Sequence, residues 1–336
     1  MRATLKDIAN EVGVSTSLVS LYLNKHPLSA KIADKTKRKI DEAVKKLDYR
    51  PSAAARALRK GKSKTIALIT GDISGGFSSF MAQSVLNEVD KFDYQLLISV
   101  TNFNREKERK CLHNMLDRQA DGIIYHLNYF GDPEMDERLH NYPFVQMSSR
   151  YPAFCDATVD YTEGLRQTFE VIAKLGIRDV LFASHFFRHE WNTVSEELCK
   201  QYHVPYQAID PENDCETFYE QLARRNPELF VSYSWIFVND YMRYCSEHNI
   251  AARTKFVYSY TLPFNYIDSE QVIGVIRYDF KELIEHNVAK IIDLIENPGQ
   301  EISHIRFVSD FLTPEQIRYY HKQQLDDPYY RGCYKP

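Results

Sequence analysis

Residues 1–27 read MRATLKDIANEVGVSTSLVSLYLNKHP, and Gly13 divides two short runs of apolar residues. Thr4 is placed to cap a first helix, whose apolar side chains repeat on one helical face at Leu5, Ile8, Ala9 and Val12. Gly13 supplies a turn, and Ser15 is placed to cap a second helix with apolar residues at Leu18, Val19, Tyr22 and Leu23. Two helices joined at a glycine turn predict a helix-turn-helix unit, although structural helical hairpins share this pattern.

The next fifty residues extend this unit. A third helix from about Ile32 to Leu47 would close a three-helix core. Pro51 then stands where another helix can begin, and small side chains follow it in PSAAARALRK (51–60). A helix with so many small residues fits a narrow groove, and its protruding Leu58 could wedge between base steps. A plain alanine-rich linker helix is the alternative.

Charge separates the N-terminal block from the rest of the 336 residues. Residues 1–64 hold 16 Lys and Arg against 6 Asp and Glu, a net charge of +10. The remainder holds 26 basic and 40 acidic residues, a net charge of −14. The split indicates that only the N-terminal block meets a polyanion, unless the block is simply a solvated basic surface.

Other features limit the class of protein. The chain has no apolar run of about 18 residues, and its first residues are too polar for a signal peptide. Six scattered cysteines form no C-x-x-C pair, which argues against a zinc ribbon or a disulfide framework. We therefore expect a cytoplasmic protein.

Strand-like apolar runs alternate with amphipathic helical patterns after residue 64. The expected strands are residues 65–70, 94–100, 122–126, 143–147, 179–184, 229–234 and 255–260, and helices are expected at 78–92 and 104–119. Continuous apolar strands alternating with helices predict an α/β fold with parallel sheets covered on both faces. The number of units favours two lobes, with a ligand site at the carboxyl ends of the strands.

The opening of the chain carries four motifs, which are TLKDIANEVGVS, LVSLYLN, LDYRPSAAARALR and TIALITGDISGGF. Together they resemble the opening of the lac repressor (LacI–GalR) family of bacterial transcription regulators. The likeness continues more weakly to KLGIRDV (174–180). It implies a helix-turn-helix headpiece (1–50), a hinge helix and linker (51–62), and a two-lobed, periplasmic-binding-protein-like body (63–336) for effector binding and dimerisation. The N-lobe would comprise 63–159 and 279–305, and the C-lobe 160–278 and 306–336.

The resemblance implies a sequence-specific DNA-binding transcription regulator, a repressor that binds a palindromic operator as a dimer. A small-molecule effector between the lobes would control its DNA affinity. The segment QQLDDPYYRGCYKP (323–336) lacks the heptads of a tetramer zipper, which favours the dimer. One alternative is the same regulator controlled by a partner protein, without an effector. A sugar-binding or enzymatic α/β protein is a remote alternative, because it has no use for a basic headpiece.

The family's DNA-facing positions fall on a defined set of residues here. Those in the headpiece are Thr4, Leu5, Ser15, Thr16, Ser17, Leu21, Asn24, Thr36 and Tyr49, and those in the hinge are Ser52, Ala55 and Leu58. Ser15, Asn24, Thr36 and Tyr49 would touch phosphates, and Thr16 and Ser17 would touch bases. The family usually carries Arg at the position of Leu21, and leucine can contact only apolar groups such as a thymine methyl.

The effector positions implied by the resemblance depart further from the family. They are Asp72, Phe77, Ser148, Arg188, Trp235, Tyr260 and Thr261. The family's sugar-gripping carboxylates are missing at Ser148, Trp235 and Thr261, whereas Arg188 adds a cation. This balance favours an anionic effector, such as a phosphorylated or acidic sugar, with its ring against Trp235 or Tyr260. An empty cleft sealed by its aromatic residues is the alternative.

Signals of catalysis and of cofactors are weak. His185 and His189 have the spacing of two metal ligands on a helix, but no third ligand pattern accompanies them. The chain has no G-x-S-x-G, and GDISGG (71–76) lacks the Lys-Ser/Thr of a P-loop. We therefore expect no enzyme activity, no metal and no cofactor.

Overall fold

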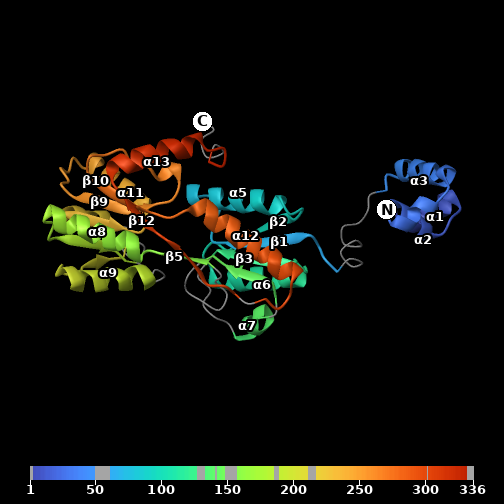
Figure 1. The fold of residues 1–336 in the computed structure, drawn as a ribbon, viewed down its shortest axis with the longest axis horizontal. Coiled ribbons are helices and arrows are strands. Elements are labelled where there is room, and N and C mark those ends of the chain that lie inside the picture. Colours follow the sequence, from blue (N-terminus) through green and yellow to red (C-terminus); the bar gives the residue numbers. More distant parts are fainter. Residues whose placement is uncertain are drawn as a thin grey trace. The chain divides into compact units, whose positions relative to one another are not determined.

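The computed structural model describes residues 3–49, 61–126, 133–140, 142–147, 157–184, 189–210, 217–300 and 302–330. The chain divides into two compact units, Met1–Ser63 and Lys64–Pro336, here called the headpiece and the body. Figure 1 labels their elements along the chain. Among the described residues, no helix is both long and apolar enough to cross a membrane.

Residues 3–49 of the headpiece form a bundle of three α-helices, as predicted. They are α1 (Leu5–Val12), α2 (Thr16–Leu23) and α3 (Asp34–Lys46), with a 3₁₀ turn, η1 (Pro27–Lys31), before α3. The predicted third helix is confirmed, although it begins at Asp34. Each helix contributes to one small core of fully or almost fully buried side chains, which are Ile8, Ala9, Val19, Ile40 and Ala43.

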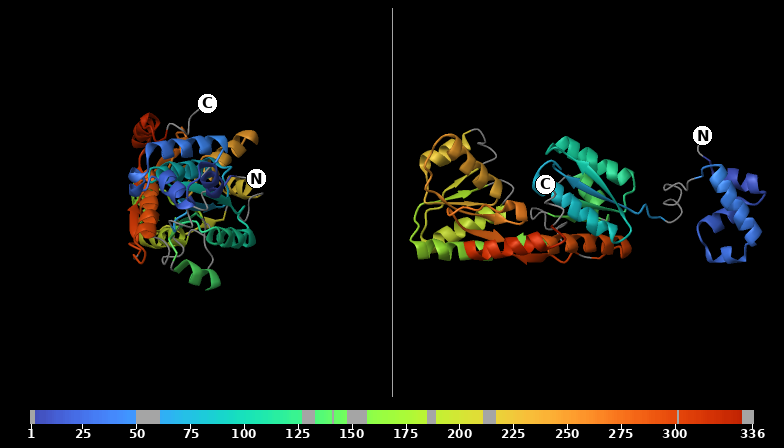
Figure 2. Two further views of the ribbon diagram at one scale, coloured as in Figure 1. Left: turned by 90° about the vertical axis from the view of Figure 1, so that its right-hand side faces the viewer. Right: turned by 90° about the horizontal axis from the view of Figure 1, so that it is seen from above.

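The described part of the body contains two large sheets, and the right-hand view of Figure 2 shows them in two separate lobes. The first sheet has the order β2-β1-β3-β4, from β1 (Thr65–Thr70), β2 (Gln95–Val100), β3 (Gly122–His126) and β4 (Phe144–Gln146). All of its strand pairs are parallel, as predicted. Its helices are α5 (Gly76–Asp90), α6 (Arg105–Asp117), α7 (Pro133–His140) and α12 (Phe280–Glu296).

Strand β1 shows why its sequence is apolar throughout. Ile66 and Leu68 lie in the core that contains α5 and α12, whereas Ala67 and Ile69 pack with α6 and α7. Successive side chains of a strand point to opposite faces, so a strand covered on both faces needs a continuous apolar run. The run TIALIT therefore encodes a central strand.

The second sheet has the order β12-β10-β9-β8-β6-β7. Its strands are β6 (Val180–Ala183), β7 (Ala208–Ile209), β8 (Leu229–Ser232), β9 (Lys255–Tyr260), β10 (Val272–Arg277) and β12 (Asp310–Leu312). Its helices are α8 (Thr162–Leu175), α9 (His189–Tyr202), α10 (Phe218–Arg225), α11 (Trp235–Glu247) and α13 (Pro314–Asp326), with a 3₁₀ turn, η3 (Pro263–Asn265).

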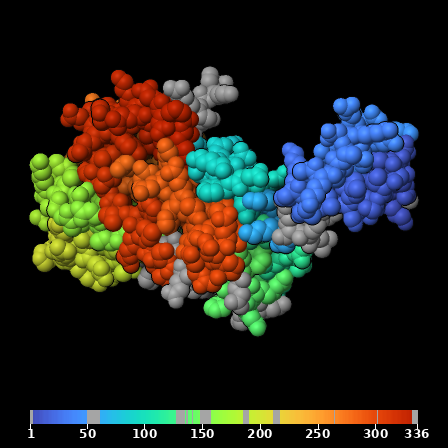
Figure 3. All heavy atoms as spheres, turned by 45° about the vertical axis from the view of Figure 1, so that its right-hand side comes forward, coloured from blue at the N-terminus to red at the C-terminus, as the bar shows by residue number. Residues whose placement is uncertain are grey.

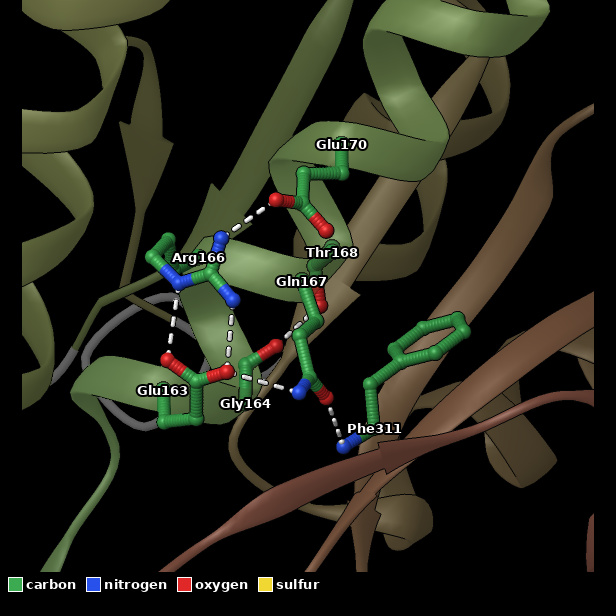
Figure 4. A network of polar contacts seen from close by, with 7 residues as sticks. All are labelled: Glu163, Gly164, Arg166, Gln167, Thr168, Glu170 and Phe311. Carbon is green, nitrogen blue, oxygen red and sulfur yellow. Dashed lines mark hydrogen bonds and ion pairs between the residues drawn. The ribbon is translucent and has the colours of Figure 1, made fainter.

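The prediction of purely parallel sheets needs one correction. Edge strand β12 runs antiparallel to β10. A polar network on α8 holds it there (Figure 4): Gln167 accepts a hydrogen bond from the Phe311 N–H at 2.8 Å and donates one to Glu163 at 2.7 Å. Arg166 pairs with both Glu163 and Glu170 and so completes the network. A side chain 144 residues earlier thus accepts a backbone hydrogen bond from β12, whose direction is given by its pairing with β10.

The chain passes between the two large sheets three times. Strands β5 (Ala157–Asp160) and β11 (Ile305–Val308) form a separate parallel pair at two of these crossings. The third crossing runs from the end of β10 at Arg277 to the start of α12 at Phe280. The sheets therefore belong to two lobes, whose finer boundaries remain a prediction.

Candidate functional site

The turn between α1 and α2 is set by local chemistry. The Thr4 side chain accepts a hydrogen bond from the Asp7 N–H, and the Asp7 carboxylate accepts one from the Thr4 N–H, which forms a capping box. At the other end of α1, Gly13 has a φ of 73°, in the left-handed region that favours glycine. The chain thus reverses within two residues, and Ser15 caps α2 by accepting from the Leu18 N–H at 3.2 Å.

The first turn of α2 presents small polar side chains to solvent. Thr16 and Ser17 are exposed, whereas Val19, two residues further on, is completely buried. Leu21 is half-buried, and Asn24, which ends the helix, is exposed. The helix therefore has one face in the core and one open face, which begins at its N-terminus.

Two contacts fix α2 and α1 to α3. The Tyr22 hydroxyl donates to Asp41 at 2.8 Å, and this hydrogen bond raises the pKa of the Tyr22 phenol above its usual value. Lys46 pairs with Glu11 at 2.7 Å. Because both contacts join elements across the bundle, α2 is held on a rigid support.

Several expected phosphate ligands already serve the headpiece itself. The Thr4 hydroxyl donates to Asp7 at 2.7 Å, and the Asn24 side chain donates to the Ser20 carbonyl. Thr36 on α3 and Tyr49 beyond it are half-buried, as is Leu5. Thr4 and Asn24 would have to share or exchange these hydrogen bonds to reach a phosphate.

Part of the predicted site lies outside the described residues. This applies to the hinge positions Ser52, Ala55 and Leu58, and to the effector positions Ser148 and Arg188. The predicted hinge helix therefore remains an expectation.

The first lobe places polar groups at the carboxyl ends of its strands. Asp72 follows β1, and its half-buried carboxylate has one oxygen, Oδ1, without a hydrogen-bond partner among the described residues. Thr70 lies beside it and is 3.4 Å from the His126 Nδ1 at the end of β3. The Phe77 ring packs against the rings of Phe280 and His126, with 5.4 Å and 6.0 Å between the ring centroids. Asp72 and Phe77 thus lie at the same edge of the sheet, as expected.

In the second lobe, one predicted residue has a different place. Tyr260 ends β9, but its side chain is 0% exposed. Its hydroxyl donates to Gln324 at 2.7 Å and lies 3.2 Å from the His321 Nδ1. The expectation that Tyr260 stacks on a ligand is therefore wrong for this structure, because the ring is part of the core.

The other two predicted residues of this lobe follow strands β8 and β9. Thr261 is buried and accepts a hydrogen bond from Asn265 at 3.0 Å. Trp235 begins α11 and is half-buried. Trp235 is thus the described aromatic residue of the predicted set that retains an open surface in this lobe.

The structure adds an aromatic cluster that sequence reasoning missed. Tyr161, Tyr233 and Tyr278 each follow a strand, and all three are buried. The ring centroid of Trp191, at the start of α9, lies 5.3 Å from that of Tyr161 and 6.4 Å from that of Tyr233. The ring centroids of Tyr278 and Tyr161 are 6.2 Å apart. The signal was present, since each tyrosine comes within a residue of a strand's carboxyl end, but only the sheet order brings them together.

No metal centre emerges from the described part of the chain, where no three His, Cys, Asp or Glu side chains gather as ligands. His185 lies outside the described residues. Cys111, Cys199 and Cys245 are buried and free.

Comparison with known families bears on the headpiece. Residues 4–52 match the family model described as bacterial regulatory proteins, lacI family. The chain carries a lacI-family helix-turn-helix domain. In this lacI-family headpiece, α2 is the second helix of the motif, and its exposed Thr16 and Ser17 are the residues that open it.

Curated relatives are also regulators by name. The chain is 28% identical over 191 residues to catabolite control protein A of Priestia megaterium, which covers 55% of each chain. It is 32% identical over 179 residues to catabolite control protein A of Staphylococcus aureus (strain Mu50), covering 52% of this chain and 53% of that protein. The chain thus spans about half the length of the curated relatives it matches.

A solved structure extends the likeness beyond the lacI-family headpiece. The lac repressor dimer bound to operator and the anti-inducer ONPF superimposes with a TM-score of 0.73 at 17% identity. The match covers 94% of this chain and 99% of that one. The likeness in fold therefore covers both the headpiece and the two-lobed body.

Proposed function

We propose that this chain is a DNA-binding transcription regulator, a repressor that binds a palindromic operator as a homodimer. One observation carries the proposal: the lacI-family headpiece exposes Thr16 and Ser17 at the N-terminus of α2, the end that meets base edges in helix-turn-helix complexes. Such a protein acts in the cytoplasm, where its DNA is, and needs no catalytic residues.

The contacts divide into two classes. Ser15, Asn24, Thr36 and Tyr49 would touch phosphates and fix the register of α2, and they carry no sequence information. Thr16, Ser17 and Leu21 would read bases. The net charge of +10 over residues 1–64 supplies the sequence-independent attraction to the duplex.

A selection from random duplexes, followed by footprinting on the selected site, tests the proposal. A homodimer has two-fold symmetry, so the site should be a near-palindrome whose two half-sites are protected equally. The matched control replaces the base-reading pair with alanine (Thr16→Ala, Ser17→Ala), which should abolish selection but leave weak binding to random DNA. An asymmetric footprint with one protected half would contradict the dimer.

We further infer that a small molecule binds between the lobes, near Asp72, Phe77 and Trp235. The missing carboxylates at Ser148, Trp235 and Thr261, together with Arg188, favour a phosphorylated or acidic sugar. A regulator without an effector is the second candidate. The buried aromatic cluster around Trp191 favours it, because the cluster occupies the strand ends where a ligand would lie.

Thermal unfolding separates the two candidates. A ligand that binds the native state raises the melting temperature with the logarithm of its concentration. Phosphorylated and acidic sugars should therefore raise it, neutral sugars should not, and Arg188→Ala should remove the effect. If neutral sugars raise it and Arg188→Ala leaves that shift intact, the anionic effector is excluded. If none of these compounds acts at millimolar concentration, control by a partner protein is favoured.

A further inference from the structure

The segment after α13 returns from the second lobe to the first. Helix α13 packs on β10 and β12 of the second sheet. Four residues later the chain contacts α5 and α12, which cover the first sheet. Figure 1 shows this turn beyond the end of α13, and in Figure 3 the end of α13 (red) abuts α5 (cyan). We call residues 327–330, Asp327 to Tyr330, the C-terminal clasp.

Aromatic rings form the main contact of the clasp. The Tyr330 ring stacks on Phe80 of α5, with 5.8 Å between the ring centroids and 15° between the planes. Tyr329 meets the same Phe80 edge-on at 5.8 Å. Phe80 in turn packs against Phe280, the first residue of α12, at 5.9 Å. Tyr330 is 5% exposed, so the first lobe seats this ring as it would a core residue.

Polar contacts hold the clasp in shape. The Tyr329 N–H donates to the Asp327 carboxylate at 2.8 Å, and the Tyr330 N–H donates to the Asp327 carbonyl at 3.0 Å. Lys281 of α12 lies 3.8 Å from the other Asp327 oxygen and 5.2 Å from the centre of the Tyr329 ring. Burial raises the pKa of both tyrosines above the usual value, so the rings stay neutral.

Helix α13, which precedes the clasp, is anchored in the second lobe. Buried Gln324 on α13 accepts the Tyr260 hydroxyl at 2.7 Å, which connects α13 to β9 of the second sheet. The clasp therefore joins two anchored bodies and is not a free tail. It adds a fourth link to the three crossings, and side chains make its contacts with the first lobe.

We propose that the C-terminal clasp sets the arrangement of the two lobes by tying α13 to α5 and α12. Any rotation of one lobe against the other must carry Tyr330 with Phe80 or break their contact. The clasp thus biases the lobes toward the arrangement in which the ring is seated. Its consequence for DNA affinity rests on the proposed function, whereas the link between the lobes does not.

Hydrogen exchange of the full chain, followed by mass spectrometry, tests the clasp. Tyr330→Ala should accelerate exchange in the first turn of α12 and in the crossing strands β5 and β11 by roughly three- to tenfold, the scale of losing one aromatic pair. Strands β8 and β9 should be unchanged. Tyr330→Phe, which keeps the ring, should behave like the unaltered chain.

Tyr319→Ala is the matched control, because this tyrosine is also on α13 but is 68% exposed and outside the clasp. If Tyr330→Ala changes exchange only in residues 327–330 and α5, the clasp is local packing and the proposal fails. If Tyr330→Ala does not fold, Asp327→Ala decides: faster exchange in β5 and β11 supports the clasp, and unchanged exchange overturns it.

DNA binding is measured on the same variants as a separate readout. On the selected duplex, Tyr330→Ala should change the affinity by a similar factor and Tyr319→Ala should not. A chain that binds no DNA at all would contradict the proposed function but leave the exchange result standing.

Discussion

At the scale of single residues, the headpiece uses the same side chains for folding and for its proposed contacts. Ser15 caps α2 through an oxygen that accepts the Leu18 N–H, which leaves the hydroxyl proton for a phosphate. The Thr4 hydroxyl, by contrast, already donates to Asp7. Ser15 is therefore better suited to a phosphate than Thr4, although both occupy N-caps.

Leu21 sets the first prediction. Leu21→Arg places a guanidinium on the half-buried edge of α2, where it can reach guanine through two hydrogen bonds. We expect the selected half-site to change at one position in favour of guanine, by about 1–3 kcal/mol of discrimination. Selection from random duplexes measures this, with Leu21→Met as the apolar control. An unchanged half-site would show that Leu21 faces no base.

His321 gives a prediction about pH. Burial lowers the pKa of this imidazole below 6.5, and its ring stacks on Tyr266 at 4.3 Å and adjoins the Tyr260 hydroxyl. The unfolded chain then binds more protons than the folded one below pH 6.5, so this contribution to stability is present at neutral pH and lost on acidification. Urea unfolding at pH 7.5 and pH 5.5 should show a larger loss for the unaltered chain than for His321→Gln.

The size of that difference is bounded. A single group changes the free energy of unfolding by at most about 1.4 kcal/mol per pH unit. Equal losses in the two proteins would show that other groups cause the acid sensitivity.

At the scale of elements, glycines decide how closely β12 and α8 approach β10. A Cβ on Gly274 would lie 1.9 Å from the Phe311 ring, and one on Gly164 would lie 2.6 Å from Ile276. Both distances are shorter than non-bonded carbon atoms tolerate, so Gly274 admits no side chain while Phe311 keeps its place, and Gly164 admits none while Ile276 keeps its place. The antiparallel edge strand therefore depends on two glycines that precede it in the sequence.

Gly274→Ala should destabilise the body by about 1–3 kcal/mol, the usual effect of overpacking a buried site. Denaturant unfolding of the full chain measures the change. Gly75→Ala is the control, because Gly75 has open space around it and an ordinary φ of −75°; it only replaces the N-cap of α5 and should cost less than about 1 kcal/mol. Replacing the ring with a smaller side chain in the double variant Gly274→Ala/Phe311→Leu should restore part of the lost stability. If the double variant is no more stable than Gly274→Ala, the clash with Phe311 is not the cause of the destabilisation.

At the scale of the whole molecule, charge assigns DNA binding to one unit. The net charge is +10 over residues 1–64 and −14 over the remainder, so the duplex attracts the headpiece and repels most of the body. The affinity for any duplex should therefore depend strongly on salt.

A protein that makes six to ten phosphate contacts loses roughly 10³- to 10⁵-fold in affinity between 50 and 200 mM salt, and we expect a loss at the lower end of this range. Titrations at several salt concentrations measure the slope. Removing a charge from the body, as in Lys200→Gln, should leave the slope unchanged, because this lysine lies on α9 and pairs with Glu196 at 2.8 Å. A change of slope in that variant would show that the body also contacts the DNA.

The sequence by itself determined the features that depend on neighbours a few residues apart. The caps at Thr4 and Ser15, the left-handed turn at Gly13 and the apolar run of β1 are all readable because helix caps, turns and strand alternation are local. The charge split is equally visible, since it needs no coordinates.

Only the tertiary structure decided which distant residues meet. Tyr260 resembles a pocket residue at the end of its strand, but Gln324 and His321, more than sixty residues later, hold its hydroxyl in the core. The aromatic cluster around Trp191 and the seating of Tyr330 on Phe80 arise in the same way. The sequence lists the aromatic rings, but which of them pack together depends on strand order and lobe connectivity, because side-chain packing is set by proximity in space.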